Sequence, residues 1–350
     1  MLTIRTLFQR LAAVCGVLVL VTVLFAGHCQ SGPGLRSQTP NLYVVQEGSV
    51  GDVPSVARNV HPALTGSGVA SVLVFPLTAS GDVAPTTTIS GANTDLQGSS
   101  ACAFDASGNL YVTDITSNSV TVYAAGASGD VAPISTISGA NTLLNNPEAV
   151  VLDSKGNIYV ANFGTGGASS GSVTIFSAGA NGDVAPLSTI TGSNTNFGSP
   201  DGIALDAAGK IYVANVNGVG ITVYAAGATG NVAPVATISG SNTGINSAAG
   251  VALDATGNIY VVNSTGPSVT VYSPGTNGNI APIATISGSS TTLVHPIAVA
   301  LDALANIYVS DNQSSSVLIF AAGAHGNIAP AAVISGANTG FASLRGVTVH

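Results

Sequence analysis

The stretch Gly182-Asp-Val-Ala-Pro186 is one of six near-copies of the same phrase in this chain of 350 residues. The phrase reads GDVAP from Gly81, Gly129 and Gly182, GNVAP from Gly230, and GNIAP from Gly278 and Gly326. Successive copies start 48, 53, 48, 48 and 48 residues apart. A period of this length indicates one supersecondary unit repeated along the chain, whose copies must pack on one another to bury their apolar faces.

Each repeat carries the signals of four strands. In the repeat that starts at Pro147, the expected strands are 149–153, 157–161, 172–176 and 187–190. Asp153-Ser-Lys-Gly156 reads as a turn after the first strand, and the GDVAP phrase reads as a turn before the fourth. Because the second residue of that phrase is Asp in some copies and Asn in others, we expect it to cap a turn by hydrogen bonding.

The two ends of the repeat region predict how the sheets close. The strand that begins at Asn41 corresponds to a second strand of the repeat, and Gly346–His350 corresponds to a first strand. The last strand should therefore complete the sheet that the first one begins, which leaves no open edge. We predict an all-β, six-bladed β-propeller over residues 41–350, made of four-stranded blades and closed by the C-terminal strand pairing with the N-terminal blade.

Composition narrows the possible partners. The chain has a formal net charge of −8, and only 6% of its residues are charged. An acidic chain with few lysines and arginines repels phosphate backbones, so no nucleic-acid partner is expected. Cys102 is the only cysteine in the region 41–350 and aligns with aliphatic residues of the other repeats, which indicates a buried apolar side chain. We expect a monomer.

The N-terminus has the pattern of an export signal. Arg5 and Arg10 precede an uncharged apolar run over 11–27. Residues 1–29 are interpreted as a cleaved signal peptide, a lipoprotein signal with Cys29 as the lipidated residue, or an uncleaved anchor, and residues 30–40 as a flexible linker. All three alternatives place the propeller outside the cytoplasm, either secreted or attached to the cell envelope, with membrane contact only through the N-terminal segment.

One repeat resembles a known family. Pro200-Asp-Gly-Ile-Ala-Leu-Asp206, followed by Gly209-Lys-Ile-Tyr-Val-Ala-Asn215, is similar to the NHL repeat and to the related repeat of gluconolactonase-like propellers. The resemblance covers residues 41–350 and implies the propeller fold. It leaves the activity open, because this superfamily contains lactonases, lyases, sensor domains and protein-binding platforms.

The mouth of the central channel is the first candidate site. Loops from fourth to first strands and from second to third strands should share one face, which we call the mouth face. Five residues before the end of each first strand lie Ser100, Glu148, Asp201, Ala249, Ile297 and Arg345. Among them Glu148, Asp201 and Arg345 are the charged departures from the repeat and the candidate ligand-binding residues. Alternatively, the two acids pair with Arg345 or face solvent.

Loops on the mouth face provide further candidates. An insertion between Val45 and Val72 contains Glu47, Arg58 and His61, and His295 precedes a first strand. Long loops on a rigid scaffold often carry binding residues. Asn162 and Asn215 follow second strands, where they either cap turns or offer hydrogen bonds to a polar ligand.

The resemblance also implies an alternative function. In gluconolactonase-like enzymes the aspartate of Pro-Asp-Gly helps to bind a divalent metal, and Asp201 matches it, with Glu148 on the adjacent blade. Our leading interpretation is a non-catalytic binding scaffold without a cofactor, whose partner is a protein, a glycan or an envelope component. The alternatives are a lactonase-like hydrolase that uses a divalent cation such as Ca²⁺ at Asp201 and Glu148, and a purely structural adhesive role. No nucleophile motif is visible in the sequence.

Overall fold

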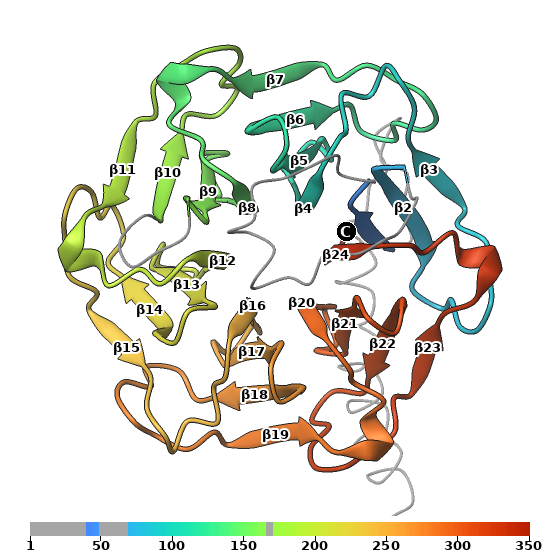
Figure 1. Ribbon diagram of the computed structural model, residues 1–350, viewed down its shortest axis with the longest axis vertical. Coiled ribbons are helices and arrows are strands. Elements are labelled where there is room, and N and C mark those ends of the chain that lie inside the picture. Colours follow the sequence, from blue (N-terminus) through green and yellow to red (C-terminus); the bar gives the residue numbers. More distant parts are fainter. Residues whose placement is uncertain (1–39, 49–68, 166–170) are drawn as a thin grey trace, which may run out of the picture. The chain divides into compact units, whose positions relative to one another are not determined.

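The computed structural model describes residues 40–48, 69–165 and 171–350. The region Pro40–His350 forms one compact unit. Its described residues build six antiparallel sheets of four strands each, arranged as blades around a centre (Figure 1). The predicted six-bladed β-propeller is thus confirmed.

The blades follow the chain order. Blade 1 contains β24 (Leu344–Val349), β1 (Asn41–Gln46), β2 (Ser71–Pro76) and β3 (Thr87–Ile89). Blade 2 contains β4 (Ser99–Phe104), β5 (Leu110–Asp114), β6 (Ser119–Tyr123) and β7 (Ser135–Ser138). Blade 3 contains β8 (Pro147–Leu152), β9 (Ile158–Asn162), β10 (Ser172–Phe176) and β11 (Ser188–Thr191).

The second half of the ring repeats this order. Blade 4 contains β12 (Pro200–Leu205), β13 (Ile211–Asn215), β14 (Gly220–Tyr224) and β15 (Ala236–Ile238). Blade 5 contains β16 (Ala248–Leu253), β17 (Ile259–Asn263), β18 (Ser268–Tyr272) and β19 (Ala284–Ser287). Blade 6 contains β20 (Pro296–Leu301), β21 (Ile307–Asp311), β22 (Ser316–Phe320) and β23 (Ala332–Ile334). Short 3-10 turns follow four outer strands: η2 (Ala140–Thr142), η3 (Ser193–Thr195), η4 (Ser289–Thr291) and η5 (Ala337–Thr339).

The ring closes as the sequence predicts. β24 pairs antiparallel with β1, with Val44 opposite Val347. The pairing extends to the chain end, where the Asn41 amide donates to the His350 carbonyl at 2.7 Å and the His350 amide donates back at 3.0 Å. The last strand therefore completes the first blade, and β1 is paired on both sides.

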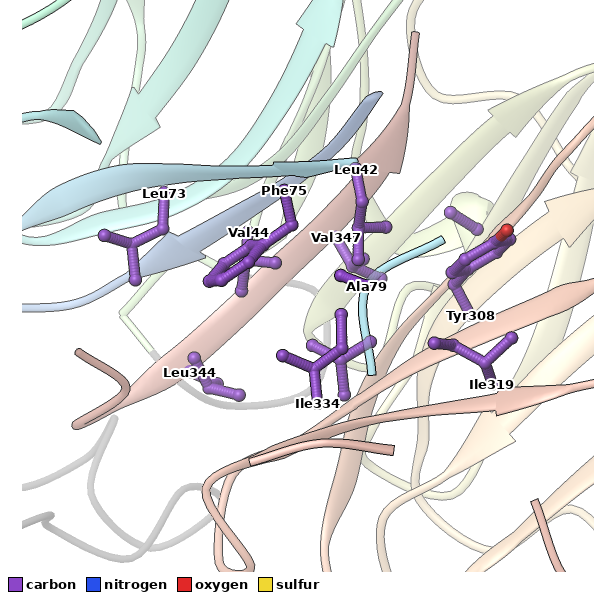
Figure 2. Close-up of a cluster of buried hydrophobic side chains, with 12 residues drawn as sticks. Leu42, Val44, Leu73, Phe75, Ala79, Tyr308, Ile319, Ile334, Leu344 and Val347 are labelled. Carbon is purple, nitrogen blue, oxygen red and sulfur yellow. The ribbon is translucent and has the colours of Figure 1, made fainter. Parts of the chain in front are cut away.

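Apolar side chains fill the space between neighbouring blades. Figure 2 shows the seam between blades 1 and 6, where Leu42, Val44 and Phe75 lie near Ile319 and Ile334. Because blades pack on both faces, the residues of a middle strand such as β6 are all buried, which explains their Val- and Tyr-rich sequence. Each fully buried aliphatic or aromatic side chain contributes roughly 1.5–3 kcal/mol to stability.

The GDVAP turns join one blade to the next. Gly182, between β10 and β11, forms a parallel bridge with Ile137 on the outer strand of the preceding blade. Asp183 then accepts hydrogen bonds from the backbone amide and the side-chain amide of Asn141, at 2.7 and 3.0 Å. The side chain caps a turn, as expected, but the turn belongs to the neighbouring blade. Copies with Asn keep the backbone bond, because a side-chain oxygen accepts it equally well.

A second recurring phrase receives this cap, and the sequence reasoning missed it. Ser138-Gly-Ala-Asn-Thr142 recurs, with small changes, after each outer strand. Gly139 has φ 119°, and a Cβ there would lie 2.4 Å from Cγ of Asp183. Glycine is therefore required both by the backbone conformation and by the close approach of the capping side chain.

The described part of the chain holds no helix with the length and apolarity that a membrane crossing needs.

Candidate functional site

The innermost strands surround a central channel with a cavity volume of about 320 Å³. Figure 1 shows β24, β4, β8, β12, β16 and β20 following one another around it. The six predicted mouth positions, Ser100, Glu148, Asp201, Ala249, Ile297 and Arg345, all line this cavity. The lining otherwise consists mainly of Ala, Gly, Val, Ile and Leu, so the charged groups are concentrated in one ring.

A β-bulge places each mouth residue. In blade 3 Pro147 pairs with Asn162 and Ala149 with Ala161, which leaves Glu148 as the extra residue of its strand. The same register shift surrounds Asp201 in blade 4 and Arg345 in blade 1. An extra residue bends the strand and redirects its side chain. The bulges therefore explain how residues of strands packed on both faces line the channel.

Arg345 forms a buried ion pair with Glu47. Its Nη2 lies 2.6 Å from Oε2 of Glu47, and its Nε donates to the same oxygen at 2.8 Å. Glu47 directly follows β1, and its backbone amide donates to the Ser343 carbonyl at 2.9 Å, beside the start of β24. Glu47 therefore lies beside Arg345 and pairs with it, although it is not one of the residues that line the channel.

A specific signal could have identified Glu47. It occupies the repeat position that holds Ile115, Phe163, Val216, Ser264 and Asn312 in the other blades. All of these residues are buried, so a carboxylate at this position departs from an otherwise uncharged pattern. In the sequence, Glu47 is a candidate only as part of the long loop between Val45 and Val72.

The charges of the mouth act on one another. Burial by itself lowers the pKa of the Arg345 guanidinium, but the charges of Glu47, Glu148 and Asp201 and the hydrogen bond from Glu47 outweigh it and raise this pKa above its ordinary value. Glu148 also accepts a hydrogen bond from Ser100 Oγ at 2.6 Å. Glu47, Glu148, Asp201 and Arg345 are each 4–7% exposed.

This donor set does not fit a calcium ion. Ca²⁺ takes six to eight oxygen ligands. At the mouth, Ala249 and Ile297 offer no side-chain oxygen, and the guanidinium of Arg345 opposes a second cation. Among the described residues, no group of three or more His, Cys, Asp or Glu side chains could hold a metal ion.

The amides after the second strands hold loops of the protein itself. Oδ1 of Asn162 accepts the Asn145 amide at 3.1 Å, and Oδ1 of Asn215 accepts the Gly198 amide at 3.0 Å. Both side chains are fully buried and also donate within their own blades. These hydrogen bonds correspond to the alternative in which Asn162 and Asn215 cap turns.

His295 is not among the described residues that line the channel. His295 is partly buried in the loop before β20, where its backbone amide donates to Oδ2 of Asp311 at 3.0 Å. Arg58, His61 and Cys29 lie outside the described residues. Cys102 lines the channel wall, and burial raises the pKa of its thiol, which suits an apolar wall residue rather than a nucleophile.

Comparisons with known proteins support the fold. No family model and no curated protein matches the chain. A structure of the nidogen/laminin complex is 15% identical with a TM-score of 0.60, over 89% of this chain and 98% of the other. A Bacteroides fragilis protein described as a candidate 6-phosphogluconolactonase is 12% identical with a TM-score of 0.56, over 90% and 99%. A streptogramin B lyase is 13% identical with a TM-score of 0.51, over 69% and 70%.

At these identities the likeness concerns the fold alone. The chain is a β-propeller, and structures that resemble it include both a binding complex and proteins named as enzymes. A function must therefore be argued from the residues at the mouth.

Proposed function

We propose that the chain is an NHL-type propeller that acts as a non-catalytic binding scaffold through its mouth face. The observation that carries this proposal is the gathering of Glu148, Asp201 and Arg345 in one buried ring around an otherwise apolar channel. Charged groups at the mouth of a concave site provide orientation and specificity for a polar ligand. The NHL assignment rests on the repeat Pro200–Asn215.

The partner is a protein, a glycan or an envelope component. A nidogen/laminin complex among the similar structures supports a binding role for this fold. We propose that the propeller over 41–350 works outside the cytoplasm, because Arg5 and Arg10 precede an apolar run. Acidic replacements of both arginines should impair export, and Cys29→Ala should release the protein from membranes only if Cys29 carries lipid.

A lactonase-like hydrolase is the second candidate, and Asp201 in its Pro-Asp-Gly context favours it. The poor fit of the mouth to a divalent metal argues against it. Lactone hydrolysis that depends on added Ca²⁺ and disappears in Asp201→Asn would establish the enzyme and overturn the scaffold proposal.

The test of the scaffold is a thermal-shift screen of sugars, amines, amino acids and short peptides. A ligand of the mouth should stabilise the wild type and bind Asp201→Asn at least about tenfold more weakly, since a hydrogen bond to a charged group is worth roughly 1.5–3 kcal/mol. Asp130→Asn is the control, because Asp130 lies in a blade-joining turn where other copies carry Asn. A ligand that stabilises both variants equally would place binding elsewhere and refute the proposal.

A further inference from the structure

A second cavity lies at the seam between blades 4 and 5, on the face opposite the mouth face. Its volume is about 440 Å³, within the range of small-molecule sites. The β12–β13 and β14–β15 turns of blade 4 and the β18–β19 turn of blade 5 surround it, and the two blades are neighbours in Figure 1. Its lining is mainly apolar and includes Tyr212, Val223, Val235 and Ile259.

Lys210, which lines this cavity, departs from the repeat. The other five blades carry asparagine at its position, namely Asn41, Asn109, Asn157, Asn258 and Asn306. In four of them the side-chain amide donates to the aspartate of the preceding turn at 2.7–2.8 Å. The backbone amide of Lys210 donates to Oδ1 of Asp206 at 2.8 Å, but its ammonium group forms no hydrogen bond or ion pair with a described residue. A side chain that closes the turn in other blades is thus replaced by a cation beside the cavity.

The wall that blade 5 contributes also departs from the repeat. In the other five seams an alanine of the turn between the third and fourth strands packs in the apolar cluster, namely Ala79, Ala127, Ala180, Ala228 and Ala324. Blade 5 holds Thr276 at this position, and its hydroxyl donates to the Ser273 carbonyl of its own turn at 2.8 Å. Thr276 lines the cavity instead of joining the apolar cluster between blades 4 and 5. The cavity therefore lies where two residues that close the other seams are both replaced.

The lining favours an anion that carries an apolar chain. Val235 is 57% exposed, so a chain that covers it removes apolar surface from water. Lys210 supplies a positive charge. Asn277 adds a neutral donor, because its Oδ1 accepts the Thr237 amide at 3.0 Å while its Nδ2 has no partner among the described residues. One ammonium group balances one negative charge, so a carboxylate fits better than a doubly charged phosphate.

We propose that this seam cavity binds an aliphatic carboxylic acid in its ionised form. The carboxylate contacts Lys210 and Asn277, and the chain lies against Val223, Val235 and Ile259. The seam cavity and the channel mouth lie on opposite faces of the propeller, so this site is independent of the binding function proposed for the mouth.

Isothermal titration of the full-length protein with octanoate tests the site. We expect a dissociation constant below about 1 mM. Octanamide keeps the chain but lacks the charge, whereas butanoate keeps the charge but lacks half of the chain. Each should bind at least about tenfold more weakly than octanoate. A dissociation constant of octanoate above about 1 mM, or equal binding of octanoate and octanamide, would overturn the proposal.

Two variants assign the binding to the cavity. Lys210→Asn restores the residue of the other blades, so it should fold and should weaken octanoate at least about tenfold, to the level of octanamide. Lys155→Thr is the control, because it removes a cation from the corresponding turn of blade 3, outside the cavity, where blade 5 carries Thr256. It should leave octanoate binding unchanged.

Unchanged melting temperatures would show that both variants fold. Octanoate binding that is unaffected by Lys210→Asn, or weakened equally by both variants, contradicts the proposal. Tighter binding of N-acetyl-Gly-Leu than of octanoate would assign the cavity to a peptide C-terminus and overturn the small-acid site.

Discussion

The ion pair between Glu47 and Arg345 joins the two ends of the propeller, and its removal tests how the ring is held. Glu47 follows β1 and Arg345 lies on β24, and the two side chains are 7% and 8% exposed. Glu47→Gln keeps the size of the side chain and one acceptor oxygen but removes its charge. The buried guanidinium then loses its closest counter-charge.

The expected cost follows from burial. Breaking a buried pair by removing one partner costs about 3–5 kcal/mol. Because Glu148 and Asp201 still act on Arg345, Glu47→Gln should lie near the lower limit, at about 3 kcal/mol. Arg345→Met leaves three carboxylates around the mouth without the guanidinium, so it should lie near about 5 kcal/mol. The double variant removes both charges and should cost less than either single change.

Urea unfolding followed by far-ultraviolet circular dichroism measures these differences, because the chain has no tryptophan for fluorescence. At about 2 °C for each kcal/mol in a large domain, Glu47→Gln should lower the melting temperature by roughly 6 °C. A double variant as destabilised as the sum of the two single variants would refute the reasoning. A destabilisation below about 1 kcal/mol for Glu47→Gln would also refute the reasoning, because solvent-exposed ion pairs contribute up to about 1 kcal/mol to stability.

Two further predictions concern the scaffold. Deletion of Gly346–His350 removes most of β24 and exposes strand edges in blade 1. We therefore expect aggregation or loss of the cooperative unfolding transition. A truncated chain that stays monomeric in light scattering and melts like the full chain contradicts C-terminal closure. Gly139→Ala should cost about 2–4 kcal/mol, from about 1–3 of backbone strain and about 1 of lost capping by Asp183. The double variant Gly139→Ala/Asp183→Ala should be destabilised by about 1 kcal/mol less than the sum of the two single variants. Gly179→Ala is the control, because its Cβ would meet no atom within 4 Å. Its destabilisation should simply add to that of Asp183→Ala.

Much of the architecture could be predicted because the sequence repeats with a nearly constant period. Strand alternation, turn residues and the spacing of the GDVAP phrase are local properties, and they repeat often enough to exclude other folds. The phase difference between Asn41 and Gly346–His350 predicted the closing pair for the same reason. Counting back from the end of each first strand also located the six positions that line the channel mouth.

The contacts of that mouth could not be predicted in the same way. The partner of Arg345 is Glu47, which is 298 residues away in sequence and reaches it only because the ring closes. The cap formed by Asp183 acts on Asn141 of the preceding blade, a pairing that requires the packing angle between blades.

The sequence by itself determined the number of blades, the closing strand and the ring of mouth positions, since these follow from periodicity and chain direction. Only the tertiary structure decided which charges meet at the mouth. Such pairings depend on β-bulges, blade packing and ring closure, which bring together side chains that no local pattern connects.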